Sequence, residues 1–162
     1  MLASRIAGFV VASVGALLMG IGATATWITV GIPNEPAHTA IRGTDLTDGL
    51  VVLLCAILTL AAVVATRIAG WWSARKAFGA SAAIAGLVAV AIGVAFLIGG
   101  KDRDAVIKAL GIPRDIWLQF GAFRNLGPGA YLALIGGILG VFGGLMIVLW
   151  AAMGDRGRPD AA

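Results

Sequence analysis

The chain has 162 residues, of which 60% are hydrophobic and 12% are charged, and its formal net charge is +4. Soluble domains carry about 25% charged residues, so this composition excludes an ordinary water-soluble protein. The basic residues flank apolar segments instead of forming a dense stripe, which argues against nucleic acid as a partner.

Charged residues are absent from four long segments of the chain, which are residues 6–34, 49–66, 77–100 and 125–154. Each segment has the length of a membrane-spanning helix, which needs about 20 mostly apolar residues. We therefore predict an all-α fold, an integral membrane four-helix bundle that forms a single domain over residues 1–162 in the lipid bilayer. The predicted spans are 6–30, 48–66, 77–100 and 128–151, with external segments at 31–47 and 101–127.

The short loops predict the orientation. The loop 67–76 carries three basic residues and no acid, whereas the loop 35–48 carries Arg42 against three acids. Short loops rich in Lys and Arg face the cytoplasm, so we predict that both termini lie there, in a bacterial cytoplasmic (inner) membrane. The segment 101–124 would lie outside with five basic residues, which makes the two sides equal at six each.

The N-terminus has features of both a signal peptide and a first span. Arg5 precedes an apolar run, and residues 23–25 have the small-x-small form of a cleavage site, whose use would leave three spans. The apolar run continues to Val30, however, and we predict that it stays uncleaved, with Trp27 as an anchor at the outer interface. Trp71, Trp72 and Trp150 would anchor the inner side.

Small residues recur every four positions in the first and last spans. Transmembrane helices associate where small residues let their backbones approach, because lipid tails are as apolar as leucine. The predicted packing or partner faces, a glycine-zipper pattern, consist of Gly136, Gly140, Gly144, Ala12, Ala16 and Gly20. These faces either meet inside the bundle or receive a helix from a partner, which would be another copy or a larger subunit.

The loop before the second span carries two carboxylates. Thr47 or Asp48 is a candidate helix N-cap, and the alternative is a cation site made by Asp45 and Asp48. Two carboxylates fall short of the six to eight oxygens that Ca²⁺ prefers, so we predict capping and no metal site. With His38 and Cys55 as the only histidine and cysteine, an intrachain disulfide, a cysteine zinc site and a multi-histidine site are excluded.

Residues 101–124 alternate charges with apolar stripes, which predicts a short amphipathic helical segment in the headgroup plane. Its aromatic stripe, the candidate for interfacial docking, includes Trp117, Phe120 and Phe123. The segment would serve either as a lid over the bundle or as a docking surface for a partner.

The four charge-free segments contain no ionisable residue except Cys55 and Tyr131, which argues against proton-coupled transport. Clustered catalytic or metal-binding side chains are also missing from the sequence, so we expect neither an enzyme nor a cofactor. The leading hypothesis is a non-catalytic accessory or scaffold subunit bound to a larger membrane complex, or a homo-oligomer. The alternative is a small oligomeric channel or transporter whose path lies between subunits.

Three motifs carry a resemblance to a known class. They are Trp27 after the first span, Gly-Thr-Asp-x-x-Asp-Gly at 43–49, and Gly-Pro-Gly at 127–129 before a glycine-rich last span. In this order the chain resembles small four-span membrane proteins of actinobacteria, and the resemblance implies the fold without an activity. The topology is also claudin-like, but the paired external cysteines and the Gly-Leu-Trp element of claudins are missing.

Overall fold

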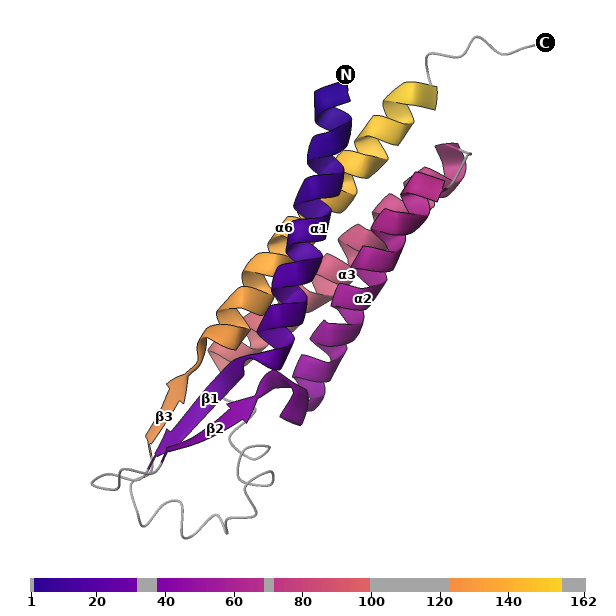
Figure 1. Cartoon of the computed structure of the whole chain (residues 1–162). Helices are drawn as coiled ribbons and strands as arrows, with labels where there is room; N and C mark the ends of the chain where they lie inside the picture. Colours follow the sequence, from indigo (N-terminus) through magenta and orange to yellow (C-terminus); the bar gives the residue numbers. More distant parts are fainter. Residues whose placement is uncertain (1, 32–37, 69–71, 100–122, 156–162) are drawn as a thin grey trace, which may run out of the picture.

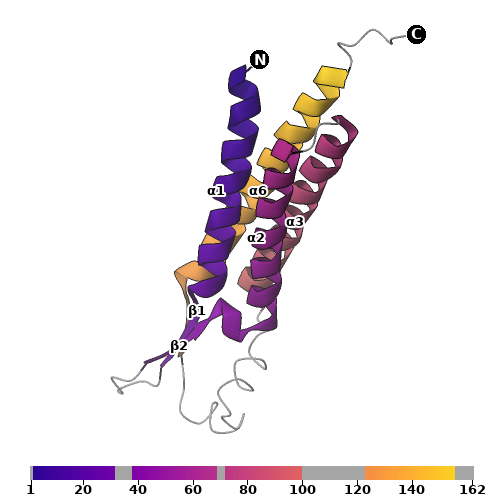
Figure 2. The ribbon, with the colours of Figure 1, turned by 45° about the vertical axis from the view of Figure 1, so that its right-hand side comes forward.

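The computed structural model describes residues 2–31, 38–68, 72–99 and 123–155. Four long helices lie side by side, with both chain termini at one end and a small sheet at the other (Figures 1 and 2). We call these the termini end and the sheet end. The helices are α1 (Leu2–Thr24), α2 (Thr47–Ile68), α3 (Trp72–Gly99) and α6 (Pro128–Asp155). All four are long and apolar enough to cross a membrane, which confirms the predicted four-span bundle.

The helices form a ring in which α6 packs between α1 and α3, and α2 completes the ring on the opposite side. Successive spans run in opposite directions, so α6 is antiparallel to both of its neighbours. The closest packing therefore involves the last helix and not the pairs joined by the shortest loops.

Glycines spaced seven residues apart bring α1 and α6 into backbone contact. A Cβ atom built on Gly15 would lie 2.6 Å from the amide nitrogen of Gly140 and 2.7 Å from the carbonyl oxygen of Gly136. One on Gly22 would lie 2.8 Å from the carbonyl oxygen of Gly129. A seven-residue spacing keeps residues on one face of two helices that coil around each other, so the seam continues along both helices.

A second seam of the same kind joins α3 to α6. A Cβ atom on Gly86 would lie 2.7 Å from the carbonyl oxygen of Gly137, and one on Gly144 would lie 2.7 Å from the carbonyl oxygen of Gly79. Any side chain larger than hydrogen would push these backbones apart. The helix α6 is thus held between two glycine seams, whereas α2 packs through larger side chains such as Val52.

The sheet has three antiparallel strands in the order β2–β1–β3. They are β1 (Thr26–Gly31), β2 (His38–Arg42) and β3 (Phe123–Leu126), and a 3-10 turn, η1 (Gly43–Asp45), connects β2 to α2. The central strand joins segments about a hundred positions apart in the sequence, because it pairs with both β2 and β3.

The sheet corrects three sequence predictions. The first helix ends at Thr24 and not at residue 30, because Thr26–Gly31 form strand β1. The external segment 31–47 contains β2 and η1 in place of a simple loop. Phe123, predicted within an amphipathic helical stripe, begins strand β3.

Two further predictions concern the sheet end, namely the N-cap of the second span and the helical segment before the last span. Because α2 begins at Thr47, both Thr47 and Asp48 lie within its first turn, and Leu46 occupies the cap position with its carbonyl accepting a 3.2 Å hydrogen bond from the amide of Leu50. The predicted helical segment at 101–122, with Trp117 and Phe120, lies outside the described residues.

Candidate functional site at the sheet end

The sheet end is organised around Trp27, which is fully buried in the second position of β1. The β1–β2 register shifts by one residue here, because Thr26 pairs with Arg42 while Ile28 pairs with Ile41. Successive side chains of a regular strand point to opposite faces of the sheet, and a bulge interrupts this alternation. Both Trp27 and Ile28 are therefore able to be completely buried, although they are neighbours in the chain. The sequence-based prediction that Trp27 is an anchor at the membrane interface is therefore wrong.

Polar and aromatic contacts hold the indole ring. Its Nε1–H donates a 2.7 Å hydrogen bond to the carbonyl oxygen of Gly22 in the last turn of α1. Carbonyls in a last turn lack partners within the helix, so the indole caps α1. The ring of Phe96 from α3 meets the indole edge-on, with 4.7 Å between ring centroids and 74° between planes. Trp27 thus links α1, the sheet and α3.

Two glycines make room for the indole. A Cβ atom on Gly43 would lie 2.5 Å from Nε1 of Trp27, and one on Gly129 would lie 2.5 Å from Cδ1 of the same ring. The backbone of Trp27 is fixed as well, because its carbonyl oxygen accepts a 2.7 Å hydrogen bond from the amide of Gly127. All three glycines belong to the sequence motifs 43–49 and 127–129, so these motifs form one socket around Trp27.

The rest of the 43–49 motif makes the turn from the sheet into α2. The amide of Gly43 donates to the carbonyl of Ala25 at 3.0 Å, and the amide of Leu46 donates to the carbonyl of Gly43 at 2.9 Å. A carboxylate oxygen of Asp45 accepts a 3.0 Å hydrogen bond from the backbone amide of Arg42. Among the residues with described coordinates, no three His, Cys, Asp or Glu side chains gather as metal ligands would.

Hydroxyl groups within the spans bond to their own helices. The hydroxyl of Thr59 donates to the carbonyl of Cys55 at 2.8 Å, and that of Thr66 donates to the carbonyl of Val63 at 2.6 Å. Both threonines are buried, and the more exposed Ser81 bonds to Ala77 in the same way at 2.9 Å. These hydroxyls have no spare hydrogen to donate to a substrate.

The predicted packing residues lie between helices of the chain itself. Gly136 faces α1 at Met19, Gly144 faces α3 at Ala83, and Gly140 lies between the two neighbours. On α1, Ala12 contacts α6 at Gly143, Gly20 faces α2, and Ala16 belongs to the buried core. The four-residue spacing predicted these packing faces, but the seven-residue spacing, which was not used in that prediction, separates the face toward α1 from the face toward α3.

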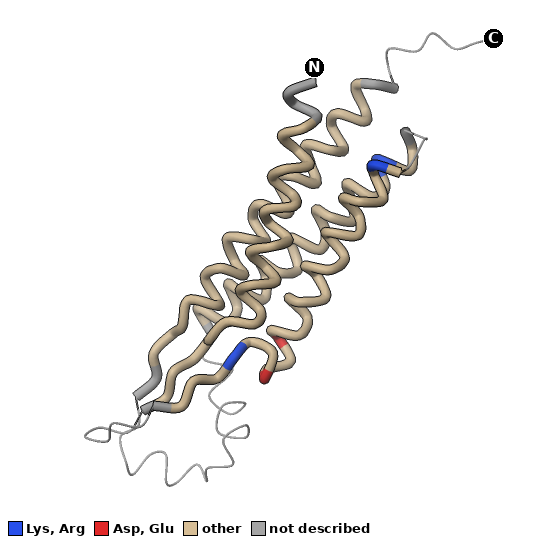
Figure 3. The backbone as a smooth tube through the Cα atoms, in the orientation of Figure 1, with Lys and Arg blue, Asp and Glu red and all other residues tan. Residues whose placement is uncertain are grey.

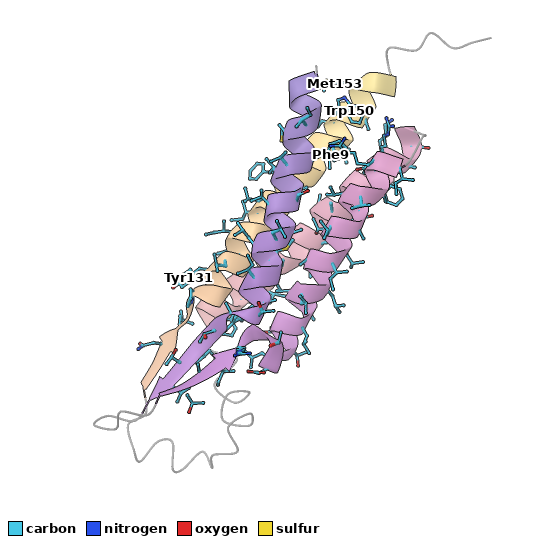
Figure 4. All side chains as sticks on the ribbon, viewed as in Figure 1. Phe9, Tyr131, Trp150 and Met153 are labelled. Carbon is cyan, nitrogen blue, oxygen red and sulfur yellow. The ribbon has the colours of Figure 1, made fainter. Side chains whose placement is uncertain are left out.

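Cation–π contacts join the helices at the termini end. The guanidinium of Arg67, in the last turn of α2, lies 4.6 Å from the centroid of the Phe9 ring on α1. The guanidinium of Arg75, in the first turn of α3, lies 5.5 Å from the ring of Trp150 on α6. Figure 4 shows Phe9 and Trp150 at this end and Tyr131 near the sheet.

These features define a small four-span membrane protein whose helices are locked by glycine seams at the interior and by a tryptophan socket at one end. Residues 9–159 match the family described as tryptophan-associated transmembrane protein, and the chain belongs to that family. The match spans the socket, most of α1 and the whole of α2, α3 and α6. No curated protein matches the chain.

Proposed function

We propose that this protein is a non-catalytic accessory or scaffold subunit of a larger complex in the bacterial cytoplasmic membrane. The observation that carries the proposal is the apolar interior of the bundle. Thr59 and Thr66 are the buried polar side chains among the residues that the structure describes, and each bonds to its own helix. Transport and catalysis usually need convergent polar or ionisable groups, so this interior favours a structural role.

The sheet end supplies a platform for a partner. The segment 100–122 begins after α3, and its far end continues into β3, which pairs with the central strand β1. Its aromatic residues Trp117 and Phe120 are thereby joined to the part of the fold that the Trp27 socket holds. Because the glycine faces are occupied within the chain, we assign partner contact to this segment and to the lipid-facing helix surfaces.

Co-purification tests the proposal. Tagged protein extracted in a mild detergent should retain one large membrane partner in fixed stoichiometry, and Trp117→Ala/Phe120→Ala should release it. Tyr131→Ala, which removes an aromatic ring that is 46% exposed on α6, is the matched control and should keep the partner.

The competing function is a channel formed between copies of the chain. Proteoliposomes containing the purified protein alone should then conduct a solute, and tryptophan is the first solute to test because the family description names it. Flux without any partner would contradict the scaffold proposal, whereas sealed vesicles together with a stoichiometric partner would support it.

The orientation leads to a labelling prediction. In a Cys55→Ala background, Ala40→Cys in β2 should react with a membrane-impermeant thiol reagent in intact cells, because we place the sheet end outside. Ser73→Cys, beside Arg75 at the termini end, should react only after the cells are opened. Both parent residues are exposed, so the reaction depends on the side of the membrane on which each position lies. Labelling of position 73 in sealed cells would reverse the assignment of both termini to the cytoplasm.

A further inference from the structure

A long groove separates α2 from α3 on the outside of the bundle. Its volume is about 740 Å³, and it opens between exposed side chains such as Leu58, which is 60% exposed, and Ile84, which is 62% exposed. Its lining is mostly apolar and includes Val51, Ala61 and Ala65 on α2 and Phe78, Ser81 and Val88 on α3. Ser81 bonds to its own helix, so the lining offers an apolar ligand little beyond hydrocarbon contact.

The dimensions of the groove fit one acyl chain. The lining runs from Phe78 to Val88 on α3 and from Ala65 to Val51 on α2, which at 1.5 Å per residue is about 15 Å and about 21 Å. Half of the hydrocarbon core of a bilayer is also about 15 Å thick. The groove therefore spans at least one leaflet, and it starts within two turns of the termini end of α3 and within one turn of that of α2.

Cations flank the groove at that same end. Arg67 lies in the last turn of α2, and Arg75 and Lys76 lie in the first turns of α3, beside the groove residues Ala65 and Phe78. Figure 3 shows basic positions (blue) at the termini ends of α2 and α3 and acidic positions (red) at the sheet end. The sheet end carries Asp45 and Asp48 together with Arg42. The loop 67–76 contains no acid. A headgroup above the groove would thus meet positive charge at the depth where span ends meet phosphates.

We infer that the α2–α3 groove binds an anionic phospholipid, with an acyl chain along the groove and the phosphate beside Arg67, Arg75 and Lys76. The guanidinium groups of Arg67 and Arg75 lie over rings of the other two helices, 4.6 Å from the centroid of Phe9 on α1 and 5.5 Å from that of Trp150 on α6, so they attract the headgroup through their charge and not as direct ligands of the phosphate. Burial of an acyl chain alone would not discriminate between lipids with different headgroups. The cations supply the selectivity for a negative headgroup.

The second groove on α2 provides a comparison within the molecule. It lies between α1 and α2, has a volume of about 350 Å³, and runs from Leu60 toward Thr24 and Leu53 near the sheet end. It extends toward the sheet end, where Asp45 and Asp48 outnumber Arg42, so the charge there does not favour an anionic headgroup. The inference therefore applies to the α2–α3 groove.

Native mass spectrometry of the intact protein tests the site. The protein is released from nanodiscs that contain equal amounts of phosphatidylglycerol and phosphatidylcholine, and the retained lipid is counted. Phosphatidylglycerol should be retained preferentially. A basic residue near the surface contributes about 1 kcal/mol of attraction, so Arg67→Gln/Lys76→Gln should lower the preference about fivefold for each cation removed.

Matched variants separate the effect of charge from the effect of groove shape, and both from a loss of folding. Arg67→Lys/Lys76→Arg keeps both charges and should keep the preference, as should Arg42→Gln at the sheet end. Ala61→Phe fills the groove and should reduce retention of both lipids, while Ala95→Phe, an exposed α3 alanine outside the lining, should not. Far-ultraviolet circular dichroism confirms that each variant is folded.

Three results would overturn the inference. The first is equal retention of the two lipids by the unaltered protein, and the second is the same effect from Ala61→Phe and Ala95→Phe. The third is a second copy of the chain that stays bound and is released by Ala61→Phe, because the groove would then be a protein interface.

Discussion

Trp27→Ala should lower the free energy of unfolding by about 3–5 kcal/mol, the range typical of a buried tryptophan or phenylalanine truncated to alanine. The substitution empties the socket between Gly43 and Gly129 and removes the edge contact with Phe96. It also leaves the Gly22 carbonyl without its indole donor. The unfolding transition in mixed micelles, followed by circular dichroism while the sodium dodecyl sulfate fraction is increased, measures the effect.

Two control variants separate the contributions of the ring and of its N–H group to the lost stability. Trp27→Phe keeps a ring but no N–H donor, and an unpaired buried polar group costs about 1–3 kcal/mol, so its effect should be intermediate. Tyr131→Ala removes a partly exposed ring near the same end and should cost little. Equal transitions for Trp27→Ala and Tyr131→Ala would show that the socket does not stabilise the fold.

Gly143→Ala should destabilise the bundle by about 1–3 kcal/mol, the usual cost of forcing an extra carbon into a packed interior. The new methyl group would lie 2.6 Å from the Cα atom of Ala12 and 2.7 Å from its Cβ atom. Backbone cannot move aside as a flexible side chain can, so α1 and α6 would have to separate. The same detergent titration reports the change.

Gly140→Ala is the matched comparison on the same helix. Its Cβ atom would lie 3.4 Å from the Cα atom of Gly86 and 3.5 Å from the end of the Met19 side chain. These are nearly ordinary contacts, and alanine favours a helix over glycine by up to about 1 kcal/mol, so the change should be neutral or slightly stabilising. If both variants unfold alike, the seam does not depend on the close approach at Gly143.

The four spans could be predicted because their signal is local. Each is a charge-free apolar segment, and a helix in lipid satisfies its own backbone hydrogen bonds, so composition alone decides the outcome. The ends of the first span were harder to predict. Thr26–Val30 is apolar enough to prolong a helix, yet its run of β-branched residues favours a strand, and this signal was available in the sequence.

The junction at Trp27 depends on distant segments. Strand β1 meets β3 near residue 126, and the indole meets Phe96, contacts that no periodicity within one segment reveals. The motifs around Gly43 and Gly127 could be seen in the sequence, but their common purpose appears only when the fold brings both to one ring. The seven-residue glycine spacing, by contrast, was present in the sequence and would have indicated two seams.

The pairing of α1 with α6 has a consequence for biosynthesis. Helix α1 is synthesised well before its closest partner, because Gly15 and Gly22 pack against α6, which begins at Pro128. At about 5–20 residues per second, the intervening hundred or so residues take roughly 5–20 s to synthesise. During that interval the small-residue face of α1 is open to lipid, insertion factors and proteases. A chain that terminates before Pro128 cannot form the α1–α6 seam, so this face of α1 stays open for as long as the truncated chain persists.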